Sequence, residues 1–361
     1  MAASKIAISV RKITLWERLD MIPGLLSVVL SGILALLTGF RRSHKQAHSL
    51  LLHVGYAVFR KATARLSPLQ LQRIMPPTNK IYEQYAKKTK QPVQSVKLPH
   101  GVLGHWIGDK TAKNVLIWYH GGGFALPANM GYFQFFAQVI KHMQQRGKPL
   151  AVFFATYTLT PHAVYPTQIR QAVECLRYIL ETTGREPGNV FLGGDSAGGN
   201  VVGAVLSHIA HPHSQIDRLS VSQNLGGAVL MSPWTHMAAE RPVGHVVDSQ
   251  GDLITEAVEM PWRTSYMGNS KRDYYTDLSM APKDWYSSFT VNSVLILGGG
   301  NEILLPVIQD LAEKFQDAFP NVSLFIGKRE CHVAPIFNLN FGDKTETATG
   351  HRMKTWLEEL L

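Results

Sequence analysis

The chain has 361 residues, of which 45% are hydrophobic, so it can bury the core of one large α/β domain with additions or of two average domains. Its formal net charge is +10, with much of the excess before residue 100, which is typical either of attraction to an anionic surface or of a solvated basic face. Because no basic residues interleave with aromatic ones and no recognition motif occurs, we exclude nucleic acid as a partner.

Residues 22–40 form an uncharged and mostly apolar stretch. As a helix this stretch would extend about 28 Å, close to the thickness of the hydrocarbon core of a bilayer. It lacks a clean small-residue cleavage site before Arg41, so we expect a single N-terminal membrane anchor, with the endoplasmic reticulum as the candidate membrane, rather than a cleaved signal. The alternative is a helix that packs on the domain or lies in the interface, which Pro23 and three glycines favour. Basic residues flank both ends, so the orientation stays open.

The next part of the chain, residues 46–92, is expected to form a helical segment apart from the main domain. Apolar residues at helical spacing predict a helix over residues 46–75, which Pro76 and Pro77 end. Its opposite face is basic, so this segment could cover an active site or lie on a membrane surface.

From residue 93 to 361 the pattern changes to apolar strands that alternate with helices, with an insertion at about 235–290. Fully apolar strands separated by helices predict an α/β fold, with a mostly parallel central sheet covered by helices on both faces. The strands are predicted at 114–119, 150–156, 190–192, 227–231, 294–297 and 322–326, and the helices at 166–181, 200–208, 307–319 and 349–361.

A glycine-x-serine-x-glycine pattern, Gly194 to Gly198, stands between the strand at 190–192 and its helix. A serine on such a sharp turn lies in a strained backbone conformation, so the residues two before and two after it must be small. The turn presents the hydroxyl at the N-terminal end of the helix, which makes Ser196 the candidate nucleophile. The alternative is a serine that only caps the helix, and its partners elsewhere in the chain favour the first interpretation.

Acyl transfer at a serine needs a base, an acid that orients the base, and hydrogen-bond donors for the oxyanion. His332 follows the last predicted strand and is the candidate base, whereas His351 looks like a surface residue. Glu302 supplies a carboxylate after the strand at 294–297, with Asp310 as the fallback. The glycines of His120-Gly121-Gly122-Gly123 would let backbone N–H groups approach a substrate oxygen, although an ordinary glycine turn has the same composition.

These motifs resemble the α/β-hydrolase fold, and within it the hormone-sensitive-lipase-like esterases and the fungal steryl-acetyl-hydrolase-like group, over roughly residues 95–361. A further marker is the stretch 157–166, which resembles the family's tyrosine-containing segment that braces the oxyanion loop. The resemblance implies no metal and no organic cofactor. The chain departs from the family at Glu302 and Ile303, where aspartate and proline are usual. The triad that the resemblance implies is Ser196, Glu302 and His332, with oxyanion donors from the backbones of Gly121, Gly122 and Ala197.

The insertion between the fourth and fifth of these strands is rich in aromatic residues, which is typical of a lid that supplies an apolar pocket. The alternative is that these aromatic side chains form a small core of the lid itself. Two cysteines, Cys175 and Cys331, make no disulfide framework, and the histidines between 208 and 213 have no carboxylate or thiol beside them to indicate a metal site. The candidate pocket residues are Phe124, Trp234, Trp262 and Tyr266.

Three functions remain open from the sequence. The first is a membrane-associated serine hydrolase (a carboxylesterase or deacetylase) that cleaves an ester of a lipophilic alcohol such as a sterol. The second is a biosynthetic α/β-hydrolase in fungal secondary metabolism that acts on a polyketide–peptide intermediate of the cytochalasan type, where the base would promote condensation or cyclisation. The third is a non-catalytic ligand receptor on the same fold, which the presence of His332 disfavours. In each case we expect a lipophilic small molecule as the partner, and the oligomeric state is open.

Overall fold

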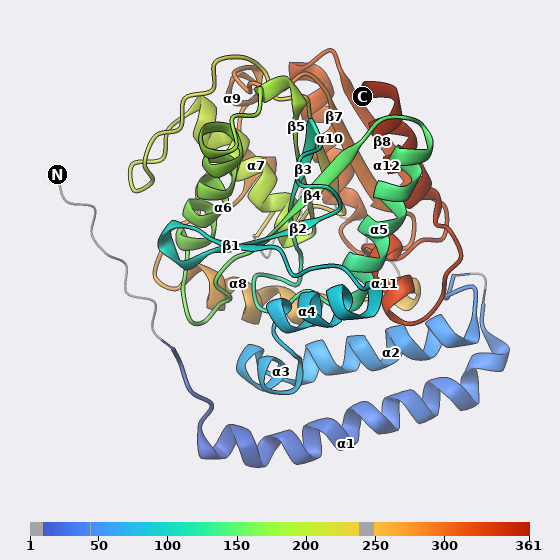
Figure 1. Cartoon of the computed structure of the whole chain (residues 1–361). Helices are drawn as coiled ribbons and strands as arrows, with labels where there is room; N and C mark the ends of the chain where they lie inside the picture. The colour runs from blue at the N-terminus through green and yellow to red at the C-terminus, as the bar shows by residue number, and fades with distance from the viewer. Residues whose placement is uncertain (1–9, 44, 238–248) are drawn as a thin grey trace.

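The computed structural model of the chain describes residues 10–43, 45–237 and 249–361 (Figure 1). Within these ranges one eight-stranded sheet has the order β1-β2-β4-β3-β5-β6-β7-β8. The pairs β1–β2 and β2–β4 are antiparallel, and every later pair is parallel. The strands are β1 (Ser95–Lys97), β2 (Leu103–Ile107), β3 (Asn114–Tyr119), β4 (Leu150–Thr156), β5 (Val190–Asp195), β6 (Gly227–Met231), β7 (Val294–Gly299) and β8 (Val322–Gly327).

Helices cover both faces of this sheet, so the predicted α/β fold is confirmed. Helices α6, α7 and α10 pack on one face, and α5 and α12 pack on the other. The helices are α1 (Leu15–Thr38), α2 (Leu50–Arg65), α3 (Pro68–Ile74), α4 (Thr78–Thr89), α5 (Met130–Gln145), α6 (Thr167–Arg177), α7 (Ala197–Ala210), α8 (Glu259–Met267), α9 (Lys283–Ser287), α10 (Leu305–Ala318), α11 (Ala334–Asn340) and α12 (Ala348–Leu360).

The central strands are buried on both faces, which is why they read as continuous apolar runs. In β3, Val115 and Ile117 join the core under α6 and α7, whereas Leu116 and Trp118 join the core under α5. This alternation follows from the two-residue period of a strand. The carboxyl ends of β3, β5, β6, β7 and β8 therefore meet at one edge, where loops can bring side chains together.

The prediction of one helix over residues 46–75 is wrong, because two helices occupy this range. Helix α2 ends before Leu66, and α3 starts anew at Pro68. Ser67 caps α3 in a capping box with Gln70, and a proline in the first helical turn has no N–H to lose there. The short strands β1 and β2 and the helices α5 and α11 are further elements that were not predicted from the sequence.

The apolar N-terminal stretch forms the 24-residue helix α1, which lies along α2 at one side of the molecule (Figure 1). Its buried residues are Gly24, Val28, Gly32 and Ala35. A Cβ added at Gly24 would lie 2.6 Å from the Leu66 side chain, and one at Gly32 would lie 2.9 Å from that of Val58. The small residues of α1 therefore let it approach α2 closely.

Candidate active site

Ser196 stands at the turn between β5 and α7 with φ 53° and ψ −119°, the strained conformation that the glycine pattern predicts. A Cβ at Gly194 would lie 2.2 Å from the carbonyl oxygen of Gly198, and a Cβ at Gly198 would lie 1.9 Å from that of Tyr119. Side chains at either position would collide with backbone, so the two glycines are needed for the turn. Hydrogen bonds of the Ser196 backbone to Met231 and Trp234, both 2.9 Å, hold the turn against the end of β6.

His332 and Glu302 form a buried pair at the same edge of the sheet. Nδ1 of His332 lies 2.8 Å from Oε2 of Glu302. The other carboxylate oxygen of Glu302 accepts hydrogen bonds from the Ser232 hydroxyl at 3.0 Å and from the Gly299 N–H at 2.5 Å. Burial lowers the pKa of His332, but the bond to Glu302 and the charges of Glu302, Asp252 and Asp195 outweigh it and raise that pKa above its usual value.

The loop after β3 presents its amides differently from the expectation. The Gly121 N–H donates to Asp195 Oδ1 and to the Tyr132 hydroxyl, each at 3.1 Å, so it is not directed at a substrate. Gly122 and Gly123 line the cavity beside Ser196. Within the part of the chain that the structure describes, the N–H groups of Gly122, Gly123 and Ala197 make no hydrogen bond. The assignment of Gly121 as a donor is thereby corrected, and Gly123 takes its place as a candidate.

This loop is braced from below by aromatic side chains. The His120 ring stacks on Tyr157 with centroids 4.5 Å apart, and the Tyr157 hydroxyl donates to the His120 carbonyl at 2.6 Å. Burial lowers the pKa of His120 to about 4, so this imidazole stays neutral and structural. From α3, the Gln72 amide donates to the carbonyls of Ala125 and Thr160 at 2.6 and 2.8 Å.

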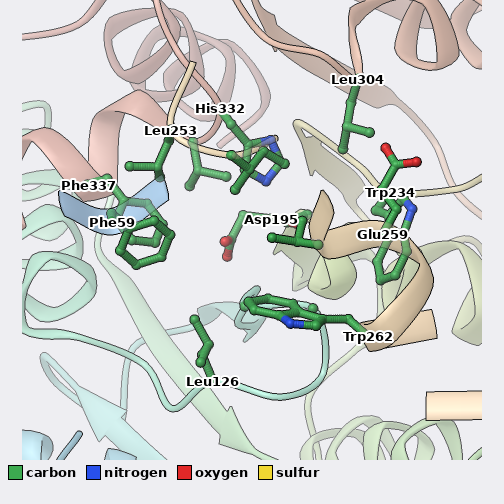
Figure 2. Close-up of a pocket in the computed structure, with 16 residues that line it drawn as sticks. Phe59, Leu126, Asp195, Trp234, Leu253, Glu259, Trp262, Leu304, His332 and Phe337 are labelled. Carbon is green, nitrogen blue, oxygen red and sulfur yellow. The ribbon is translucent and has the colours of Figure 1, made fainter. Parts of the chain in front are cut away.

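A mainly apolar cavity contains Ser196 and His332 in its lining (Figure 2). Of the predicted pocket residues, Trp234 and Trp262 line it. Phe124 and Tyr266 do not line it, because they stack on each other in the core with ring centroids 3.6 Å apart. Other apolar lining residues come from α2, α11, the insertion and the loops around them: Phe59, Leu126, Leu253, Ile254, Val258, Leu304, Val333 and Phe337.

Trp262 covers the oxyanion loop from the insertion. A Cβ at Gly123 would lie 1.9 Å from the Trp262 ring, so the indole rests directly on this glycine. In Figure 2 the indole lies across the cavity from His332. The space above Gly123 is therefore narrow.

The structure also brings in two residues that no sequence motif indicates. The Ser232 hydroxyl donates to Glu302 and accepts from the Val333 N–H at 3.2 Å. Asp252, from the insertion, accepts hydrogen bonds from the backbones of Ile303 and His332, both at 2.8 Å. Neither residue lies near Ser196 in the sequence.

Several candidates of the sequence analysis lie elsewhere. Asp310 pairs with Lys314 on α10, and His351 pairs with Glu346 at the surface. Burial raises the pKa of the thiols of Cys175 and Cys331, so neither is an activated nucleophile.

A profile described as the alpha/beta hydrolase fold matches residues 116–336. The chain belongs to this family. The match contains the elbow serine, the glycine loop, Glu302 and His332, and it confirms the resemblance drawn from those motifs.

This hydrolase-fold chain is similar to proteins that carry esterase names. It is 28% identical to Steryl acetyl hydrolase 1 of Saccharomyces cerevisiae over 250 residues. This match covers 64% of this chain and 56% of the yeast protein. It is also 28% identical to Neutral cholesterol ester hydrolase 1 of Rattus norvegicus over 119 residues, a match that covers 31% of this chain and 28% of the rat protein. The chain spans about half the length of the first curated relatives that it matches.

Solved structures agree on the fold. Carboxyl esterase 2 from the mycorrhizal fungus Tuber melanosporum superposes with a TM-score of 0.61 and 20% sequence identity, over 78% of this chain and 98% of that one.

Proposed function

We propose that the protein is a serine hydrolase of carboxylic esters, with Ser196 as nucleophile, His332 as general base and Glu302 as the acid that orients the base. The observation that carries this proposal is the buried pair of His332 and Glu302, 2.8 Å apart, whose imidazole lines the same cavity as the elbow serine. The similarity to esterases and acetyl-hydrolases supports the reaction class.

In the proposed reaction, His332 takes the proton of the Ser196 hydroxyl while the hydroxyl oxygen attacks the ester carbonyl. The N–H groups of Gly122, Gly123 and Ala197 would stabilise the oxyanion of the tetrahedral intermediate, because no other acceptor in the described chain engages them. The imidazolium then returns the proton to the departing alcohol. A water molecule hydrolyses the acyl-enzyme by the same route, and Glu302 stabilises the imidazolium in both halves.

We infer that the substrate is a short acyl ester, such as an acetate, of a lipophilic alcohol. The cavity lining is mainly apolar, which suits a lipophilic alcohol. Trp262 leaves little room beside Gly123 for a long acyl chain. The names of the yeast steryl acetyl hydrolase and the rat cholesterol ester hydrolase point to the same class of ester.

This proposal is tested with aryl esters of increasing acyl length and with a fluorophosphonate probe. We expect turnover of the acetate to exceed that of the octanoate, and the phosphonyl adduct to lie on Ser196 by peptide mass spectrometry. Heat-denatured protein is the control and should take up no probe. Absence of an adduct would contradict the hydrolase mechanism, and an adduct without turnover of any ester would favour the biosynthetic alternative.

We also infer that α1 associates with a membrane by lying in the plane of the interface. The stretch Leu15–Arg41, which is α1 and the short turn after it, is long and apolar enough to span a membrane. Polar contacts hold its N-terminal half to the domain, since Asp20 pairs with Arg65 of α2 and Gln70 of α3 donates to the Glu17 carbonyl at 2.8 Å. Large apolar side chains along α1 and in the turn after it are between 37% and 80% exposed: Leu15, Trp16, Leu19, Ile22, Leu25, Leu26, Val29, Leu30, Ile33, Leu34, Leu36, Leu37 and Phe40.

An interfacial helix and a spanning helix differ in the depth of their residues. The test attaches fluorophores to single cysteines at positions 19, 26 and 37, which are all exposed along α1. In vesicles whose lipids carry quenchers near the headgroups, we expect the three fluorophores to be quenched equally. A cysteine at Glu313 on α10 is the control and should not be quenched. Quenching by deep probes that peaks at position 26 and falls at 19 and 37 would instead show that α1 leaves α2 and spans the bilayer.

A further inference from the structure

Asp252 is a fully buried carboxylate whose two oxygens are both engaged by backbone N–H groups. Oδ1 accepts from Leu253 at 2.6 Å and from His332 at 2.8 Å, and Oδ2 accepts from Ile303 at 2.8 Å. One side chain thus joins three segments that are far apart in the sequence: the insertion, the loop after β7 and the loop after β8.

These hydrogen bonds reach the residues closest to the proposed chemistry. His332 is the proposed base, and Ile303 directly follows the proposed acid Glu302. The bonds to the N–H groups of Ile303 and His332 fix the backbone from which the Glu302 and His332 side chains extend. They therefore help to maintain the 2.8 Å contact between imidazole and carboxylate. Proline, which is usual at the position of Ile303 in the family that the chain resembles, has no N–H and could not make this bond.

The backbone around Asp252 is itself held by a contact with the N-terminal helix α2. The Arg60 guanidinium, on α2, donates to the carbonyl oxygens of Gln250 and Asp252. Phe59, the neighbour of Arg60, lines the cavity. The segment that carries Asp252 is therefore fixed between α2 and the two loops.

A neutral side chain could not replace this carboxylate without loss. Both oxygens face N–H donors, so an asparagine would turn its own NH₂ group toward at least one of them. Burial raises the pKa of Asp252 to about 6, while the charge of His332 and the backbone donors act in the opposite direction. A buried charge that is retained at this cost points to a role beyond packing.

We propose that Asp252 is a positioning residue for the Glu302–His332 pair, which locks the acid loop and the base loop together from the insertion. This inference rests on the proposed ester hydrolysis. Asp252 does not itself exchange a proton with the substrate.

The test is Asp252→Asn, assayed on an aryl acetate across pH. We expect kcat to fall by about 10²-fold with KM nearly unchanged, because the reacting groups are displaced while the cavity keeps its shape. The carboxylates that face His332 are Glu302, Asp252 and Asp195, and each raises its pKa. Tyr56, Arg60 and Cys331 are the other titratable groups around Asp252. Removing the charge of Asp252 should lower the pKa of His332 and move the acidic limb of kcat/KM to lower pH.

The matched control is Asp277→Asn. Asp277 is also a buried carboxylate of the insertion that accepts a backbone hydrogen bond, from Met237 at 2.7 Å, and its side-chain partners in the described chain, Arg272 and Thr276, lie in the insertion as well. This variant should lose stability without a shift in the pH profile. An Asp252→Asn enzyme with the kcat and pH profile of the wild type would overturn the inference, whereas a wild type without any ester turnover would instead refute the proposed function.

If Asp252→Asn does not fold, Ile303→Pro is the second variant. It keeps the Asp252 carboxylate but removes the N–H that donates to its Oδ2. We expect it to lower kcat with KM retained. A wild-type kcat in this variant would count against a positioning role.

Discussion

Replacing Ser196 with alanine should reduce ester turnover to background, a loss on the order of 10⁴–10⁶-fold in kcat. The acyl-enzyme needs the serine oxygen, and the alanine variant retains only binding and the oxyanion donors. The fold should survive, because the contacts of Ser196 with Met231 and Trp234 run through its backbone. The measurement is acetate release from an aryl acetate, together with the melting temperature of both proteins.

Ser207→Ala is the matched control for this experiment. Ser207 is a buried serine on α7, the helix that follows the elbow, and its hydroxyl accepts from the Trp285 indole at 3.0 Å. It is not part of the cavity lining. We expect wild-type turnover in this variant. Substantial turnover in Ser196→Ala would require another nucleophile and would contradict the proposed mechanism.

The central strands and the elbow could be predicted because their signals are local. Each of the six predicted strands is found, since a run buried on both faces has no polar residue to interrupt it. Strand β1, at the edge of the sheet, escaped because it has only three residues and these are partly or fully exposed. Its neighbour β2 has the sequence Leu-Gly-His-Trp-Ile, so a glycine and a histidine interrupt the apolar run. The break between α2 and α3 also has a local signal, Ser67-Pro68, which the apolar spacing outweighed.

The details of the site depend on contacts that the sequence does not express. The Asp195 carboxylate accepts a hydrogen bond from the Gly121 N–H, so this amide is not free to bind a substrate oxygen. Aromatic composition alone did not separate Trp262, which lines the cavity, from Tyr266, which stacks in the core. Ser232 and Asp252 carry no motif, and only the fold places them beside Glu302 and His332.

Replacing Glu302 with glutamine should lower kcat by about 10⁴-fold while the protein stays folded. The carboxylate accepts on both sides, from Nδ1 of His332 and from the Ser232 hydroxyl and Gly299 N–H. A glutamine that keeps its oxygen toward Ser232 turns its NH₂ group toward Nδ1, which favours the tautomer with the proton on Nε2. That tautomer cannot accept the serine proton. Loss of the Glu302 charge also lowers the pKa of His332, so the residual activity should extend to lower pH.

Asp310→Asn is the control for the acid, since Asp310 is the next carboxylate along the chain. Its side chain pairs with Lys314 at 2.7 Å on the same helix, so its loss removes a partly exposed ion pair and little else. We expect kcat within a factor of about two of the wild type, because such pairs contribute at most ~1 kcal/mol to stability and none to the reaction. Full activity in Glu302→Gln with a large loss in Asp310→Asn would assign the acid to α10. Full activity in both would mean that neither carboxylate is needed to orient the His332 imidazole, and it would contradict the proposed role of Glu302.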